Sequence, residues 1–193
     1  MSSAAAFAVK WEPMSEPSDA RLREVFNILE RHIEDRYQVP VIIKDVPDPF
    51  AGDLDGAEIH VDYAEDIESA VFIIAHLFGH TVQWNTSDIA RELGYSVIEN
   101  PTERQLELLL DYEMDACRYS LQLFHEAGVY DLDQWLCDYS ACDLRYLLNF
   151  YKTGEKPPIK TFWEEDSPLL DPLPIPPFQT KRWVSRFNDA IVV

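Results

Sequence analysis

Apolar residues recur at helical spacing in four long stretches of the chain. The stretches cover residues 18–37, 66–84 and 102–127, and a fourth that begins at Asp131 or Asp133 and reaches residue 151. Positions three and four apart share one face of a helix, so each stretch predicts an α-helix. Thr102 and Gln105 have the spacing of a capping box, and Gly128 and Gly154 stand where helices end. A shorter helix is predicted over residues 87–93.

Two segments between the first and second helices have strand patterns. Residues 39–46 are rich in β-branched side chains, and residues 57–63 alternate, with Ile59 and Val61 on one face and His60 on the other. The second pattern predicts a strand that is half-buried. Between them, the prolines at 47–49 and the Gly-Asp-rich residues 52–56 are typical of turns and predict a flexible loop. These elements predict an α+β fold that is mainly helical, with a small sheet.

The composition changes at Lys156. Seven of the 13 prolines lie between Pro157 and Pro177, yet the same segment carries many leucine, phenylalanine and tryptophan residues. A solvated linker would not contain so many apolar side chains. We therefore predict one domain over residues 1–155 and an extended Pro-rich segment over residues 156–193 that packs on it. A path of this segment across the functional site is one alternative, and a last short helix is expected near residues 182–191.

Charge and cysteine content limit the classes of function. Sixteen Lys and Arg against 35 Asp and Glu give a net charge of −19, which disfavours binding to nucleic acid. Cys117, Cys137 and Cys142 are odd in number and form no Cys-x-x-Cys pair, as expected of buried, reduced thiols. Residues 1–9 lack a basic signal-peptide start, and no segment reaches about 18 uninterrupted apolar residues. A cytoplasmic protein without membrane contact is predicted.

Two histidines, His76 and His80, lie four residues apart in the apolar second stretch. In a helix they share one face, one turn apart, and two imidazoles so placed can hold one metal ion. Such a pair also occurs by chance, as core residues whose ring nitrogens bond to backbone or hydroxyl groups. The residue after the first histidine is Leu77, where the zinc-peptidase helix His-Glu-x-x-His has glutamate.

A carboxylate also lies on an apolar helix face. Glu113 falls in the middle of the apolar stripe of the third long helix, whereas Asp111 and Asp115 lie on its polar side. A buried carboxylate costs several kcal/mol unless something pairs with it. The partner is a metal ion held by His76 and His80, or an arginine, a buried histidine, or a proton on the acid itself.

The order of these parts resembles the zincin-like metallopeptidases, and most closely the compact ImmA/IrrE type, over residues 18–127. The shared pattern is helix, strand, alternating strand, a His-x-x-Gly-His helix, and a later helix with Glu followed three residues on by Ala. The resemblance implies a zincin-like α+β fold whose sheet packs against the histidine helix, and a peptide substrate that adds to the strand before that helix. By position, the resemblance implies that the zinc ligands are His76, His80 and Glu113. It also implies that Gly79 and Ala116 match the small residues of the family pattern.

Two positions depart from the family pattern. Leu77 replaces the general-base glutamate, and Cys117 replaces an acidic or amide residue that often follows the alanine. Loss of a positioned base typically removes about 10²–10⁴ in rate, so conventional peptide hydrolysis is not expected. Metal binding is not affected by this argument. His60, Tyr63 and Tyr112 are the candidates for another acid or base.

Three functions stay open from the sequence. The first is a metal-dependent, hydrolase-like enzyme, with Zn²⁺ as the ion and Fe²⁺ as the alternative, because two histidines and one carboxylate are also the ligands of non-haem iron oxygenases. The second is a peptidase-like protein without catalysis that binds or regulates a partner. The third binds no metal and has core histidines. A peptide or a small molecule is the expected substrate or partner.

Overall fold

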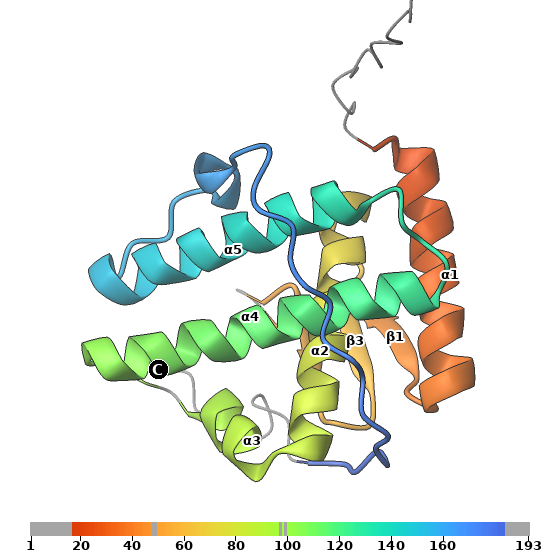
Figure 1. The fold of residues 1–193 in the computed structure, drawn as a ribbon, viewed down its shortest axis with the longest axis horizontal. Coiled ribbons are helices and arrows are strands. Elements are labelled where there is room, and N and C mark those ends of the chain that lie inside the picture. Colours follow the sequence, from red (N-terminus) through yellow and green to blue (C-terminus); the bar gives the residue numbers. More distant parts are fainter. Residues whose placement is uncertain (1–16, 48–49, 97, 99, 184–193) are drawn as a thin grey trace, which may run out of the picture.

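The computed structural model describes residues 17–47, 50–96, 98 and 100–183. These residues form an α+β fold, as predicted, with five α-helices and one small sheet (Figure 1). In chain order the elements are α1 (Asp19–Tyr37), β1 (Val41–Lys44), β2 (Gly52–Leu54), β3 (Ile59–Asp62), α2 (Ile67–Thr86), α3 (Asp88–Tyr95), α4 (Glu103–Glu126), α5 (Asp133–Thr153) and the 3-10 turn η1 (Ile159–Phe162).

The predicted helix ends agree closely with the structure. Asp66 caps α2 by accepting a hydrogen bond from the backbone N–H of Ser69 at 2.8 Å. Thr102 and Gln105 form the capping box of α4. Gly154 follows α5 with φ of 73°, a left-handed conformation that glycine adopts without steric cost.

The sheet has the strand order β1-β3-β2, with β1 parallel and β2 antiparallel to β3. The prediction of a flexible loop over residues 52–56 was wrong, because Gly52–Leu54 is a strand. Gly52 lies directly on α2: a Cβ at this position would be 2.7 Å from Ile73 Cγ2 and 2.8 Å from Leu77 Cδ1. The absence of a side chain allows the strand to approach the helix this closely and still pair with β3.

The prediction that β3 is half-buried was also wrong. Ile59 and Val61 face the core and are 0% and 1% exposed, but His60 on the opposite face is only 7% exposed. The carboxylates of Asp53 and Glu58 flank its ring, at 3.8 Å and 3.4 Å from the two ring nitrogens. Polar neighbours therefore bury the face that alternation assigned to solvent.

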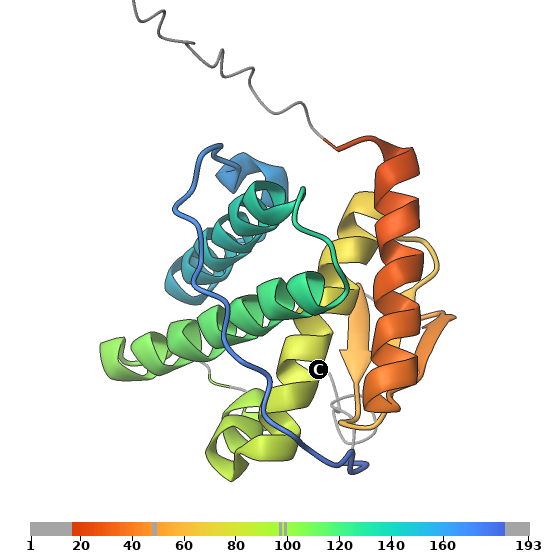
Figure 2. The same ribbon diagram turned by 45° about the vertical axis from the view of Figure 1, so that its right-hand side comes forward.

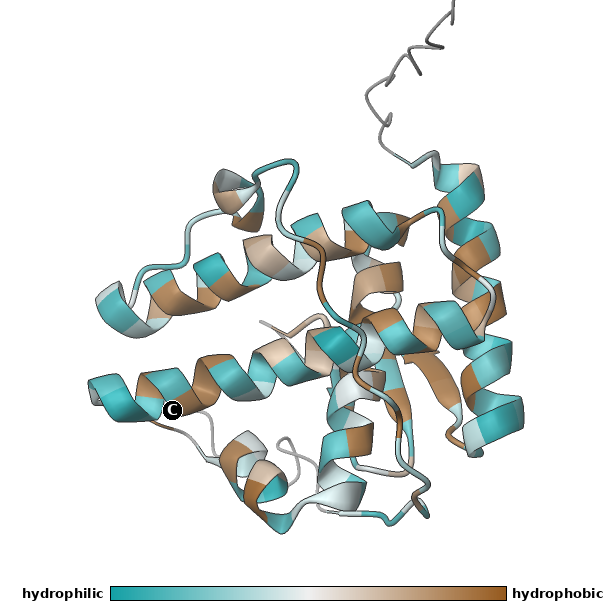
Figure 3. Ribbon diagram, viewed as in Figure 1, coloured by the Kyte–Doolittle hydropathy of each residue, from teal (hydrophilic) through white to brown (hydrophobic). Residues whose placement is uncertain are grey.

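Helix α2 runs through the middle of the fold. It packs against α1 and the sheet on one side and against α4 on the other (Figure 2). Its residues Ile74 and Phe78 are fully buried, and they belong to one core that α1, α4 and α5 also line. In Figure 3 hydrophobic and hydrophilic residues alternate along α1, α4 and α5, as amphipathic helices around such a core require.

The Pro-rich segment returns from α5 across α4 to the C-terminal end of α2, drawn in blue in Figure 1. The backbone N–H of Ser167 donates to Asp138, that of Leu173 to the carbonyl of Arg118, and that of Lys181 to the side chain of Asn85. These contacts place the described part of the segment, residues 156–183, against α5, α4 and α2. The predicted last helix falls almost entirely on residues outside the described part.

Two smaller predictions concern the cysteines and the membrane. All three cysteines are free and buried. Within the described ranges, no helix has the length and apolar character needed to cross a bilayer.

Candidate metal centre

The site begins where α2 and α4 touch. A Cβ on Gly79 would lie 2.3 Å from the carbonyl oxygen of Ala116 and 2.8 Å from its Cα, so the two backbones meet at these small residues. Glu113 lies one turn before Ala116 on α4. The close crossing therefore brings its carboxylate to the face of α2 that carries the two histidines.

Three donor atoms meet at this crossing. The Nε2 atoms of His76 and His80 lie 3.0 Å apart, and each lies 3.0 Å from Oε2 of Glu113. The exposed fractions of these three side chains are 13%, 9% and 18%. The structure thus brings together the residues that the sequence predicts as metal ligands.

A glutamine fixes the tautomer of His80. The Nε2 of Gln83 donates to the carbonyl of Tyr112 at 2.7 Å, so the amide oxygen of Gln83 faces Nδ1 of His80 at 2.8 Å. Because this oxygen can only accept, Nδ1 of His80 carries the proton. Neutral His80 then directs the lone pair of Nε2 toward Glu113 and His76. The ring also stacks on Tyr112, with centroids 4.6 Å apart.

His76 is held from its other side in a similar way. Its Nδ1 lies 3.6 Å from the sulfur of Cys117, and its ring stacks on Phe72 with centroids 5.2 Å apart. Cys117, the residue after Ala116, is therefore the neighbour of Nδ1 of His76. A thiol is a weaker acceptor than a carboxylate, so it orients the ring less strongly.

The electrostatics of the cluster favour positive charge at its centre. Burial alone would raise the pKa of Glu113, but His80 and His76 lower it well below its ordinary value. Burial lowers the pKa of His80, whereas for His76 the contacts with Cys117 and Glu113 outweigh burial and raise its pKa well above the usual value. Three electron-pair donors that point at one place repel each other unless a proton or a metal ion lies between them.

The three donors fit a small divalent ion. In a tetrahedral zinc site with bonds of about 2.0–2.1 Å, neighbouring ligand atoms lie about 3.3 Å apart. The 3.0 Å separations are within a few tenths of an ångström of that value. Among the described residues, these three form the cluster whose possible ligand atoms all lie within 4.8 Å of one another. Three protein ligands leave a tetrahedral ion with one position for water or substrate.

The cluster opens into a cavity of about 300 Å³ between β2, α2, α4 and α5. Leu77, at the position of the missing glutamate, lies on its wall and packs its Cδ1 against the backbone of Gly52. Residues 50–54 form the wall on the side of the sheet, and no described residue of the Pro-rich segment lines the cavity. The segment therefore does not cross the site along its described length.

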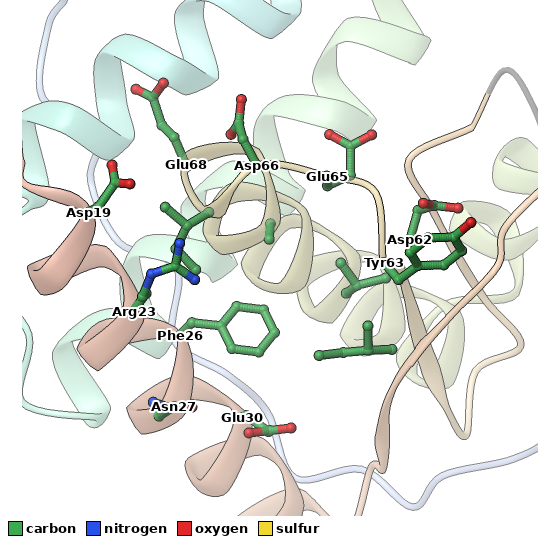
Figure 4. Close-up of a pocket in the computed structure, with 14 residues that line it drawn as sticks. Asp19, Arg23, Phe26, Asn27, Glu30, Asp62, Tyr63, Glu65, Asp66 and Glu68 are labelled. Carbon is green, nitrogen blue, oxygen red and sulfur yellow. The ribbon is translucent and has the colours of Figure 1, made fainter.

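The three acid–base candidates from the sequence lie in different places. Tyr112 lines the cavity, but its hydroxyl accepts a hydrogen bond from Nε1 of Trp84 at 2.9 Å. His60 is held between Asp53 and Glu58 and is not among the residues that line the cavity. Tyr63 is 67% exposed and belongs to a separate acidic cavity of about 600 Å³ between α1 and the start of α2 (Figure 4).

Asp143 on α5 is a cavity residue that the sequence reasoning missed. It lies one turn from Leu147, and both line the cavity with the three donors. Burial raises the pKa of Asp143 to about 6; His76 lowers the pKa and Glu113 raises it. The signal was present in the sequence, because Tyr139, Asp143 and Leu147 are spaced by four on one helix face. The same pattern singled out Glu113.

The position of the sheet corrects one implication of the resemblance. The strand before the histidine helix is β3, which pairs with β1 on one side and β2 on the other. Within the described sheet, β3 therefore has no free edge to which a peptide could add. The edge strand beside the cavity is β2, the strand that the sequence analysis took for a loop.

Comparisons with protein-family models, with curated proteins and with solved structures gave no match to this chain. The zincin-like resemblance therefore stays a prediction that rests on the motif residues.

Proposed function

We propose that the protein binds one divalent metal ion, zinc in the first place, through His76, His80 and Glu113, and that it is a metal-dependent hydrolase. The single observation that carries this proposal is the meeting of three donor atoms 3.0 Å apart on the wall of a cavity. Core histidines would need separate hydrogen-bond partners on each ring nitrogen. Here both Nε2 atoms instead face the same carboxylate oxygen and each other.

A zinc ion with one open position activates water near neutral pH and polarises a carbonyl group. The chain contributes the rest of the site. Gln83 holds His80 in the tautomer that leaves its Nε2 free, Cys117 orients His76, and the surrounding aromatic rings limit access of bulk water.

The proposed substrate is peptide-like. Residues of β2 line the cavity, and β2 is an edge strand of the described sheet, so an extended peptide that added to it would lie near the cavity of the three donors. A cavity of about 300 Å³ also has room for one or two side chains or for a small molecule. Leu77 makes the wall at the usual base position apolar, so the chemistry needs another proton acceptor.

Elemental analysis of the purified protein tests the metal site. We expect about one equivalent of zinc, lost in His76→Ala/His80→Ala and retained in His125→Ala, whose imidazole pairs with Asp133 at 2.9 Å instead. One equivalent of iron would favour the oxygenase alternative. No metal in any of the proteins, even after incubation with zinc, would leave core histidines and refute the proposal.

A second experiment separates an enzyme from a binding protein. The zinc-loaded protein is incubated with a mixture of unstructured peptides, and new termini are detected by mass spectrometry. Cleavage by the wild type that is lost in Glu113→Gln supports the hydrolase. A zinc-loaded protein that cleaves none of them but retains a peptide in pull-downs favours the inactive, regulatory alternative.

A further inference from the structure

The cavity of the proposed metal site holds one carboxylate that does not belong to the ligand set. Asp143 lies outside the cluster of ligand atoms that are within 4.8 Å of one another. It nevertheless lines the same cavity as His76 and Glu113. It is therefore too far from at least one donor to complete the set, but it faces the space in which a substrate of that ion would lie.

Asp143 also has no structural partner in the described part of the chain. Within the described ranges its carboxylate makes no hydrogen bond and no ion pair. The other carboxylate in the interior of α5, Asp138, accepts bonds from the backbone of Ser167 at 2.7 Å and from Gln134 at 3.0 Å. A partly buried carboxylate without partners costs stability, so its presence in the cavity is not explained by folding.

Its surroundings are those of a proton acceptor. His76 and Glu113 act on its charge, it acts in turn on Tyr139 and Cys142 of its own helix, and His80, Asp53 and Tyr112 line the same cavity. Leu147 and Phe72 supply apolar walls. A carboxylate that lines the cavity without a hydrogen-bond partner among the described residues is open to a proton from a bound molecule, and burial favours its protonated form. A general base is most effective when its pKa lies close to the working pH.

We propose that Asp143 is the proton acceptor and donor of this site and takes the role for which Leu77 has no group. This inference rests on the proposed function. The oxygen of a water molecule forms a bond to the substrate carbonyl carbon, the C=O π pair moves onto the carbonyl oxygen, the water O–H bond breaks, and its proton passes to Oδ of Asp143. The C=O bond then re-forms while the C–N or C–O bond breaks with its electron pair, and Asp143 returns the proton to the leaving nitrogen or oxygen. Protons and electrons balance without another reactant.

Acetohydroxamic acid tests this role without knowledge of the natural substrate. A hydroxamic acid binds a zinc ion as its anion, so the O–H proton must leave it. If Asp143 accepts that proton, wild-type zinc protein releases almost none to the buffer at pH 7. In Asp143→Asn the proton must go to the solvent or to a displaced zinc-bound hydroxide, so we expect more protons released per bound ligand than in the wild type, up to about one, and at least about tenfold weaker binding.

Calorimetric titration in two buffers with different ionisation enthalpies counts the released protons. Asp143→Ala must behave like Asp143→Asn, and Asp111→Asn, which removes an exposed carboxylate from α4, must behave like the wild type. Both Asp143 variants must keep one equivalent of zinc, with affinity lowered by about tenfold at most.

The outcomes separate the two proposals. Equal proton release in wild type and Asp143→Asn overturns the role of Asp143 and leaves the metal site intact. If Asp143→Asn loses zinc as completely as Glu113→Gln does, Asp143 is a metal ligand and the proposed role is overturned. A zinc-loaded wild type that binds no hydroxamate also overturns the role. A wild type that binds no zinc refutes the proposed function itself.

Discussion

Replacement of Asp143 by asparagine should make the metal-free protein more stable at neutral pH. Replacing a residue that serves packing lowers the stability of a protein, whereas replacing a residue that serves chemistry often raises it. Asparagine has the shape and the neutrality of protonated aspartic acid. The substitution thus removes a partly buried charge that has no partner among the described residues, and it leaves the volume of the side chain almost unchanged.

The pKa of Asp143 gives the size and the sign of the effect. It rises from an ordinary value of 3.8 to about 6 in the folded protein. Between these values the folded state binds more protons than the unfolded state, so stability falls as the pH rises from about 4 to about 6. A shift of this size corresponds to about 2–3 kcal/mol, which the wild type lacks at pH 7 and above. Below pH 4 the two proteins should be equally stable.

Urea denaturation in the presence of a chelator, at pH values from 4 to 8, measures this difference. Asp138→Asn is the matched control, because Asp138 on the same helix accepts two hydrogen bonds and should lose about 1 kcal/mol instead. Saturation with zinc should reduce the gain in Asp143→Asn, because a nearby cation favours the ionised carboxylate. A variant that is less stable than the wild type at pH 7.5, or a difference that does not change with pH, would refute the reasoning.

Three further substitutions test the helix crossing and the walls of the site. Gly79→Ala should lose about 1–2 kcal/mol of stability and bind zinc more weakly, because its Cβ would lie 2.3 Å from the carbonyl oxygen of Ala116. Thermal denaturation measures the stability and competition with a chelator measures the zinc affinity. A protein unchanged in both would contradict the close crossing. Gln83→Leu should lower zinc affinity about 10–100-fold although His80 is unchanged, as measured by competition with a chelator. Full zinc affinity in this variant would show that Gln83 is not needed to hold His80 in its tautomer. Leu77→Glu should keep its zinc, as measured by elemental analysis. It should lose about 2 kcal/mol of stability in urea denaturation, because the leucine packs against β2. An unchanged stability would argue against that packing.

The elements of this fold could be predicted because their signals are local. These signals depend on residues a few positions apart. They are the spacing of apolar residues, the N-cap at Asp66 and the capping box at Thr102, and the structure confirms them. The strand at Gly52 could not be predicted in the same way. Glycine and aspartate favour turns in isolation, and only the contact with α2, more than 20 positions away in the sequence, makes the glycine necessary.

The candidate site shows the same division. Two histidines four apart on α2 are a local pattern, and a carboxylate on an apolar stripe is another, so the sequence singled out the three residues that the structure brings together. The 3.0 Å separation of their donor atoms could not be predicted in this way, because it depends on the crossing of α2 and α4 at Gly79. The roles of Gln83 and Cys117 also depend on side-chain direction, which spacing alone does not fix.

Leu77 and Asp143 are best understood together. In this fold β2 lies so close to α2 that the side chain at position 77 is in contact with the backbone of Gly52, where an apolar group packs and a charged one would lose its water. Helix α5 approaches the same cavity from another side and presents Asp143 there, beside His76 and Glu113 but outside the ligand cluster. A carboxylate on α5 can exchange protons with a ligand in the cavity without disturbing the contact between strand and helix. The proposed role of Asp143 therefore makes catalysis compatible with leucine at position 77, because the carboxylate would come from a different helix.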